Sequence, residues 1–93
     1  MAYRRILIVK PSSLGDIVHA LPTLTALRET FPAAQIHWLV QGQWAAILER
    51  VEGLSKVWPI RPGLRGWLSI LPVLRSADFD CVVDLQGLFR SGA

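Results

Sequence analysis

The fold class of this chain is indicated first by the segment Ile6-Leu7-Ile8-Val9-Lys10-Pro11-Ser12-Ser13-Leu14-Gly15-Asp16. It opens with four consecutive aliphatic residues, three of them β-branched, which is typical of a strand buried on both faces. A short polar loop follows, and serine, glycine and aspartate are residues that commonly precede or begin a helix. A buried strand, a polar loop and a helix in this order predict the opening of an α/β unit.

Strand-like and helix-like patterns alternate along the rest of the chain. Apolar residues spaced three and four apart predict a helix over 17–31, and Pro22 is expected to start a fresh turn in that helix or to bend it. The other expected elements are strands over 35–40, 56–60 and 79–85, helices over 43–51 and 67–74, and a helix that begins near Leu88. This alternation predicts an α/β fold, a Rossmann-like parallel sheet with flanking helices and right-handed crossovers.

Two of these helices carry further expectations. The helix over 43–51 should end at Gly53, and the helix over 67–74 should be interrupted by Pro72. The residues expected on the buried face of the first of these helices are Trp44, Ile47, Leu48 and Val51. The tryptophans expected in the core or packed against helices are Trp38, Trp44, Trp58 and Trp67.

Length and composition restrict the domain organisation. A chain of 93 residues has room for one modest core, and 52% apolar against 18% charged residues excludes a disordered segment. Such an apolar excess fits a sheet that is buried on both faces. It also fits a protein surface that is covered by a structure absent from this sequence. Because the sequence stops at Ala93, soon after the fourth strand, we expect a truncated chain whose uncovered sheet edge favours self-association.

Several classes of protein are excluded or disfavoured. No stretch reaches the roughly 18 to 20 apolar residues of a membrane-spanning helix, and no secretion signal precedes the first strand, so we expect a cytoplasmic location. Cys81 lies in an apolar run and is interpreted as a core residue. The net charge of +3 is mild and the arginines are scattered, which disfavours nucleic acid and favours a small anionic partner.

The loop after the first strand is the candidate site, because open parallel sheets bind ligands at the carboxyl ends of their strands. It offers the hydroxyls of Ser12 and Ser13, a close backbone approach at Gly15, and the carboxylate of Asp16. It lacks the glycine patterns that hold a dinucleotide or a triphosphate, which disfavours NAD and ATP chemistry. A lone aspartate at a helix start is most often a cap, and the serines can equally satisfy the loop's own backbone donors.

Two further residues flank this loop. Lys10 can point its ammonium group toward a substrate phosphate or carboxylate, or it can be a solvated strand end. His19 follows Asp16 by three residues, so the two can meet on one helical face, although a packed or half-exposed histidine is an equal alternative. Two histidines this far apart in the sequence predict no metal site.

Two segments carry a resemblance to a known family. The first continues the opening stretch through Ile17-Val18-His19-Ala20-Leu21-Pro22, and the second is Val83-Asp84-Leu85-Gln86-Gly87-Leu88-Phe89-Arg90-Ser91. Both are similar to characteristic segments of the bacterial lipopolysaccharide heptosyltransferase family, glycosyltransferase family 9. The resemblance runs along this chain and covers about the first third of such an enzyme.

The resemblance implies a two-domain GT-B enzyme in which residues 1–93 are part of the amino-terminal, acceptor-binding domain. The carboxy-terminal nucleotide-sugar domain, which binds the donor ADP-heptose, would be absent, and no cofactor is implied in this chain. Such an enzyme transfers heptose with inversion to Kdo of the lipopolysaccharide inner core, on a lipid A acceptor. It works as a peripheral protein at the cytoplasmic face of the inner membrane.

The resemblance also implies roles for individual residues. The catalytic base of the family falls on Asp16, and the full Ser-Ser-Leu-Gly-Asp context favours this role over simple capping. Guanidinium groups suit the carboxylates and phosphates of the acceptor, so Arg61 and Arg65 are candidate contacts unless they are a solvated loop. The other expected acceptor contacts, at the end of the fourth strand, are Gln86, Gly87 and Arg90, while Asp84 is interpreted as structural.

Two functional hypotheses of different classes remain. The first is the acceptor half of a heptosyltransferase, and the second is a non-catalytic Rossmann-like module that kept the loop for folding reasons. The intact Asp16 favours the first hypothesis. The 93 residues alone are nevertheless expected to transfer no sugar, because half of an active site supplies neither in-line geometry nor stabilisation of the leaving group.

Overall fold

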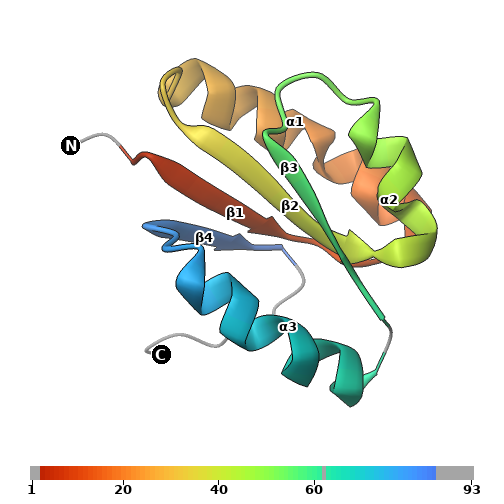
Figure 1. The fold of residues 1–93 in the computed structure, drawn as a ribbon. Helices are drawn as coiled ribbons and strands as arrows, with labels where there is room; N and C mark the ends of the chain where they lie inside the picture. Colours follow the sequence, from red (N-terminus) through yellow and green to blue (C-terminus); the bar gives the residue numbers. More distant parts are fainter. Residues whose placement is uncertain (1–2, 62, 86–93) are drawn as a thin grey trace.

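The computed structural model describes residues 3–61 and 63–85, and within them it contains one parallel sheet and three helices (Figure 1). The sheet has the strand order β3-β2-β1-β4, and every neighbouring pair is parallel. The elements in chain order are β1 (Arg5–Val9), α1 (Leu14–Thr30), β2 (Gln35–Gln41), α2 (Gly42–Glu49), β3 (Lys56–Ile60), α3 (Leu64–Ser76) and β4 (Cys81–Asp84). This confirms the predicted Rossmann-like α/β fold.

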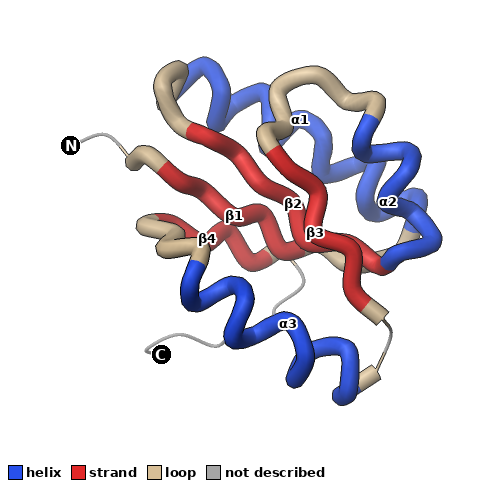
Figure 2. The backbone as a smooth tube through the Cα atoms, in the orientation of Figure 1, coloured by secondary structure: helices blue, strands red, loops and turns tan. Residues whose placement is uncertain are grey.

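The helices cover both faces of the sheet. Helices α1 and α2 lie on one face and α3 lies on the other (Figure 2). The chain moves outward from β1 through β2 to β3, and α3 then carries it back to β4 on the other side of β1. The strand order therefore reverses between β1 and β4, which is where open α/β sheets place their ligands.

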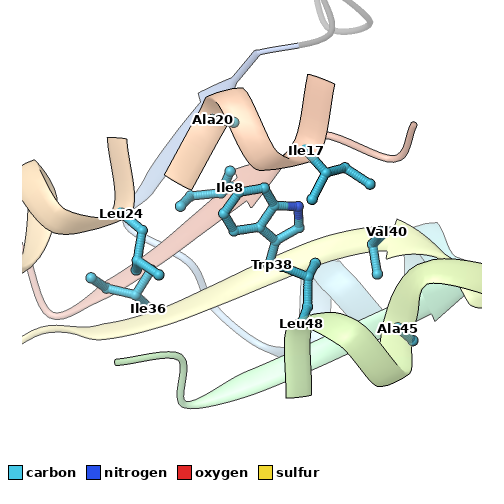
Figure 3. Packing of buried hydrophobic residues seen from close by; sticks show 9 residues of the cluster. All are labelled: Ile8, Ile17, Ala20, Leu24, Ile36, Trp38, Val40, Ala45 and Leu48. Atoms are coloured by element: carbon cyan, nitrogen blue, oxygen red, sulfur yellow. The ribbon is translucent and has the colours of Figure 1, made fainter. Parts of the chain in front are cut away.

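The larger part of the core lies between the sheet and helices α1 and α2 (Figure 3). Successive side chains of a strand point to opposite faces, so alternate residues of β1 and β2 reach this layer. At its centre lies Trp38, which is fully buried beneath α1. The residues of this cluster are Ile8, Ile17, Ala20, Leu24, Ile36, Trp38, Val40, Ala45 and Leu48.

The second layer of the core, under α3, is smaller and ends at the edge strand β4. Its buried residues are Leu7, Val9, Leu39, Ile60 and Leu74. Cys81 on β4 is only half-buried, and Val82 beside it is 49% exposed, so the interpretation of Cys81 as a core residue is wrong. The reason is position, because β4 has a strand neighbour on one side only among the described residues. The partial burial raises the pKa of the Cys81 thiol.

Helices α1 and α3 are longer than predicted. Helix α1 begins at Leu14 and continues through Pro22, where a fresh turn or a bend was expected. Helix α3 likewise continues through Pro72, where an interruption was expected. A proline inside a helix removes one backbone donor, but both prolines are exposed, so water can reach the carbonyl that loses its partner. No helix within residues 3–61 and 63–85 is long and apolar enough to cross a membrane.

The end and the buried face of α2 also differ from the prediction. The helix ends at Glu49, so Gly53 does not terminate it. Gly53 instead adopts a φ of +97° in the following turn, and a Cβ atom there would collide with the side chain of Arg28. Ile47 is 45% exposed, while Leu48 is buried as predicted. Ala45 is buried in place of Ile47, while Trp44 and Val51 are partly buried and pack against the core.

A buried histidine lies at the opposite end of the sheet from the first loop. His37 is 4% exposed, and its Nδ1 accepts a 3.0 Å hydrogen bond from Nε1 of Trp58. The indole N–H is a donor only, so His37 must be neutral with its proton on Nε2. The ring of Phe79 packs edge-on against it at 4.9 Å between centroids. Burial lowers the pKa of His37 from its ordinary value of 6.5, and the positive charges of Arg5 and Lys56 lower it further.

We predict that this histidine makes the fold sensitive to mild acid. In the unfolded chain His37 takes up a proton near pH 6.5, whereas in the folded chain it stays neutral to a lower pH. The free energy of unfolding therefore falls as the pH drops below 6.5. Urea unfolding at pH 7.5 and pH 5.0 should show a loss of stability that is smaller in the His37→Gln variant. Asp16 and Asp80, whose pKa values are lowered, stay ionised in this window. Equal losses in both proteins would contradict the prediction.

Candidate functional site

The loop between β1 and α1 is held against the end of β2. The backbone N–H of Lys10 donates to the carbonyl of Leu39 at 3.3 Å, and the carbonyl of Pro11 accepts from the N–H of Gln41 at 2.9 Å. Helix α1 then begins after Ser13. The loop therefore lies at the carboxyl edge of the sheet, beside its central strand, as the sequence predicted.

Asp16 lies in the first turn of α1 and is exposed. Its Oδ2 accepts a 3.2 Å hydrogen bond from Oγ of Ser13 and a longer one, 3.5 Å, from the backbone N–H of Ser13. These two bonds lower the pKa of Asp16 from its ordinary value of 3.8, and the charges of Lys10 and His19 lower it further. Asp16 is thus a permanently ionised carboxylate at neutral pH that caps the helix start and still faces solvent.

The neighbours of Asp16 are arranged around an open surface. Lys10 and Ser12 are half-buried, and His19 is exposed one helical turn after Asp16. Gly15 is exposed, and a Cβ atom built on it would meet no described atom within 4 Å. The open space at Gly15 would allow a bound molecule to approach the backbone.

The two candidate arginines lie farther along the same edge. Arg61 directly follows β3 and Arg65 lies in the first turn of α3, and both are exposed. Strand β2 lies between β3 and β1, which separates Arg61 from the first loop by two strand spacings, about 10 Å. The arginines can therefore contact a different part of an extended substrate than Asp16 does.

The fourth strand ends beside the first loop. Asp84 is half-buried and pairs in register with Val9, and the N–H of Leu85 donates to the carbonyl of Val9 at 3.0 Å. The chain therefore leaves β4 next to the loop that leads to Asp16. The three contacts expected in this segment, Gln86, Gly87 and Arg90, lie outside the described residues.

Sequence reasoning missed one residue that shapes this edge, Gly66. It is buried in the first turn of α3, and a Cβ atom there would collide with the carbonyl carbon and oxygen of Arg61. Because Gly66 has no side chain, the backbone of Arg61 can pack directly against the start of α3. A sequence signal existed, because the segment from Arg61 to Gly66 contains two glycines three residues apart.

We predict that Gly66→Ala destabilises the chain. Alanine normally favours a helix by about 1 kcal/mol over glycine, but here the methyl group overpacks against backbone, which costs about 1–3 kcal/mol. Urea unfolding should show the loss, while Gly42→Ala, whose Cβ would lie 3.9 Å from the carbonyl oxygen of Ile60, should not be destabilised. A Gly66→Ala variant more stable than the parent chain would contradict this packing.

The fold is shared with a solved glycosyltransferase. The family 9 glycosyl transferase from Veillonella parvula superposes with a TM-score of 0.82 over 91% of this chain and 26% of that one, at 19% identity. A Rossmann-like parallel sheet of this kind is thus found in a family 9 glycosyltransferase. This likeness shows the fold, which is part of a GT-B architecture.

The sequence comparisons give the family. Escherichia coli heptosyltransferase WaaC, solved with ADP, is 35% identical and superposes with a TM-score of 0.68 over 96% of this chain and 30% of that one. Lipopolysaccharide heptosyltransferase 1 from Escherichia coli K12 is 34% identical over an alignment of 100 positions. This alignment covers 96% of this chain and 31% of that protein. Its counterpart from Salmonella typhimurium is 36% identical over 96% of this chain and 32% of that protein.

No protein-family profile matches the chain. It nevertheless belongs to the lipopolysaccharide heptosyltransferase family, because the identity to these relatives extends over nearly all of its residues. The chain spans about a third of the length of the curated relatives it matches.

Proposed function

We propose that residues 1–93 are part of the acceptor-binding domain of an inverting heptosyltransferase. The reaction is the transfer of heptose from ADP-heptose to Kdo of the lipopolysaccharide inner core, on a lipid A acceptor. The observation that carries this proposal is the exposed, ionised carboxylate of Asp16 at the carboxyl edge of the sheet, in a chain related to heptosyltransferases along nearly its whole length.

Asp16 is the proposed catalytic base. The acceptor hydroxyl attacks the anomeric carbon of the heptose and forms the new C–O bond. The bond from that carbon to the diphosphate breaks on the opposite face, and ADP leaves with the electron pair. The proton of the hydroxyl moves to the carboxylate of Asp16. Because hydrogen bonds from Ser13 lower its pKa, Asp16 is a weak base that accepts the proton late, when bond formation has made the hydroxyl acidic.

Positive groups along the same edge are proposed to hold the acceptor. The positive charge of Lys10 acts on Asp16 and lowers its pKa. The guanidinium groups of Arg61 and Arg65 can make paired hydrogen bonds with carboxylates or phosphates farther along the edge. The remaining proposed substrate contacts are Ser12, Ser13, Gly15, His19, Gln86, Gly87 and Arg90.

The donor is proposed to bind mainly outside this chain. Two solved structures of the Escherichia coli heptosyltransferase contain ADP and ADP-2-deoxy-2-fluoro heptose, and this chain covers 30% of each. We propose that the unmatched part of the family contains the carboxy-terminal nucleotide-sugar domain. The 93 residues alone then transfer no heptose, because they supply the base but no stabilisation of the departing diphosphate.

The acceptor also implies a place in the cell. A lipid A acceptor is embedded in a bilayer, so we propose that the enzyme works as a peripheral protein at the cytoplasmic face of the inner membrane. When residues 1–93 are studied alone, the half-exposed edge strand β4 is proposed to favour self-association.

A chimera tests the proposed function. In it, these 93 residues replace the matching segment of Escherichia coli heptosyltransferase 1, and the purified protein is incubated with ADP-heptose and Kdo-lipid A. We expect heptose transfer by the chimera. A chimera that unfolds cooperatively and binds ADP but transfers no heptose would contradict the proposal.

A further inference from the structure

The buried tryptophan of β2 makes an unusual long-range contact. Trp38 is fully buried, and its Nε1 donates a 3.1 Å hydrogen bond to the backbone carbonyl of Lys10, 28 residues earlier in the chain. The large majority of buried N–H groups in proteins have a hydrogen-bond partner. Trp38 finds it on the first residue of the loop that leads to Asp16.

The same strand holds the loop at two further points. Leu39 and Gln41, which follow Trp38 on β2, bond to the backbone of Lys10 and Pro11. Three hydrogen bonds from β2 therefore fix two consecutive loop residues. The indole bond is the only one of the three that a side-chain substitution can remove.

The ring of Trp38 also reaches the other end of the loop. It packs in one cluster with Ile17 and Ala20 on the inner face of α1 (Figure 3). Ile17 is the residue after Asp16, and its N–H donates to the carbonyl of Ser13 at 2.8 Å. Trp38 therefore contacts the loop before Asp16 through its N–H and the helix that carries Asp16 through its ring.

We propose that Trp38 is a positioning residue that fixes the entry and the exit of the loop and so sets the place of the Asp16 carboxylate. Its catalytic consequence rests on the proposed function. Trp38 does not touch the substrate, because it is fully buried beneath α1. If Trp38 only filled the core, the shape of its ring would be sufficient. As a positioning residue it also needs the indole N–H that bonds to Lys10.

The first arm of the test uses the 93-residue chain and 3-benzothienylalanine, in which sulfur replaces the indole N–H while the ring keeps its shape. With this analogue at position 38, NMR titration should show the pKa of Asp16 rising toward 3.8, because the loosened loop weakens the bonds from Ser13. The pKa of Asp80, lowered by the backbone N–H groups of Arg4 and Arg5, is the internal control and should not change.

The second arm measures heptose transfer by the chimera. The analogue at position 38 should lower kcat about 10- to 100-fold with KM changed less than about twofold, because a small displacement of a catalytic group slows the chemistry. The matched control is the same analogue at position 44, because Nε1 of Trp44 is buried without a hydrogen-bond partner in the described part of the chain. That control should keep the parent kcat.

The outcomes separate the two proposals. If the analogue at position 38 leaves both the pKa of Asp16 and the kcat of an active chimera unchanged, Trp38 is a packing residue and the inference is wrong. If the unsubstituted chimera transfers no heptose, the proposed function fails, and the titration of Asp16 alone decides whether Trp38 positions the loop.

Discussion

Replacing Asp16 with asparagine is expected to reduce heptose transfer by the chimera about 100- to 10,000-fold, the range typical of a lost general base. The amide oxygen can still accept the hydrogen bonds that Ser13 donates, so the start of α1 should survive. The amide cannot accept the proton of the acceptor hydroxyl. The loss should therefore appear in kcat, with the thermal unfolding of the chimera unchanged.

An exposed acid elsewhere serves as the matched control. Asp78 lies in the turn before β4 with a φ of +58°, a conformation that asparagine adopts readily. Asp78→Asn should keep the parent transfer rate in the same assay. If Asp16→Asn retains more than about a tenth of the parent rate, Asp16 is a helix cap and not the base.

Replacing Trp38 with alanine is expected to cost about 3–5 kcal/mol of unfolding free energy, the range for a large aromatic residue removed from a core. Trp38 is fully buried at the centre of the larger cluster, between α1 and the sheet. Truncation leaves a cavity there and also leaves the carbonyl of Lys10 without its indole donor. Because small domains are stable by only about 5–15 kcal/mol, this loss is a large fraction of the total stability.

Urea unfolding of the 93-residue chain checks this result. Leu68→Ala is the matched control, because Leu68 is 58% exposed and its truncation should change the unfolding free energy by less than about 0.5 kcal/mol. A loss below about 1 kcal/mol for Trp38→Ala would mean that the core does not depend on this residue.

The fold was largely predictable because its signals are local. The apolar run Ile6–Val9 identified a buried strand, and the third strand lies at 56–60 as predicted. Errors arose where position in the sheet decides burial. Cys81 and Ile47 look apolar in sequence, but one lies on an edge strand and the other on the outer face of a short helix. Strand order and the face that a helix turns toward the sheet are tertiary properties, which sequence periodicity alone does not determine.

The candidate site was predictable in outline for the same reason. Parallel strands end at one edge, so Asp16, Arg61 and Arg65 had to lie at the same carboxyl edge of the sheet, and they do. The contacts that shape this edge were not predictable, because they join distant segments or depend on backbone geometry. The hydrogen bond from Trp38 to Lys10 joins segments 28 residues apart. The close approach of Gly66 to the backbone of Arg61 depends on backbone geometry.

The mass of Kdo-lipid A after incubation with ADP-heptose and the chimera decides whether Asp16 is the base of a heptosyltransferase. We expect the acceptor to gain one heptose with the chimera and to gain none, over the same time, with its Asp16→Asn variant. An acceptor of unchanged mass with a folded, ADP-binding chimera, or equal gains with both proteins, would contradict this expectation.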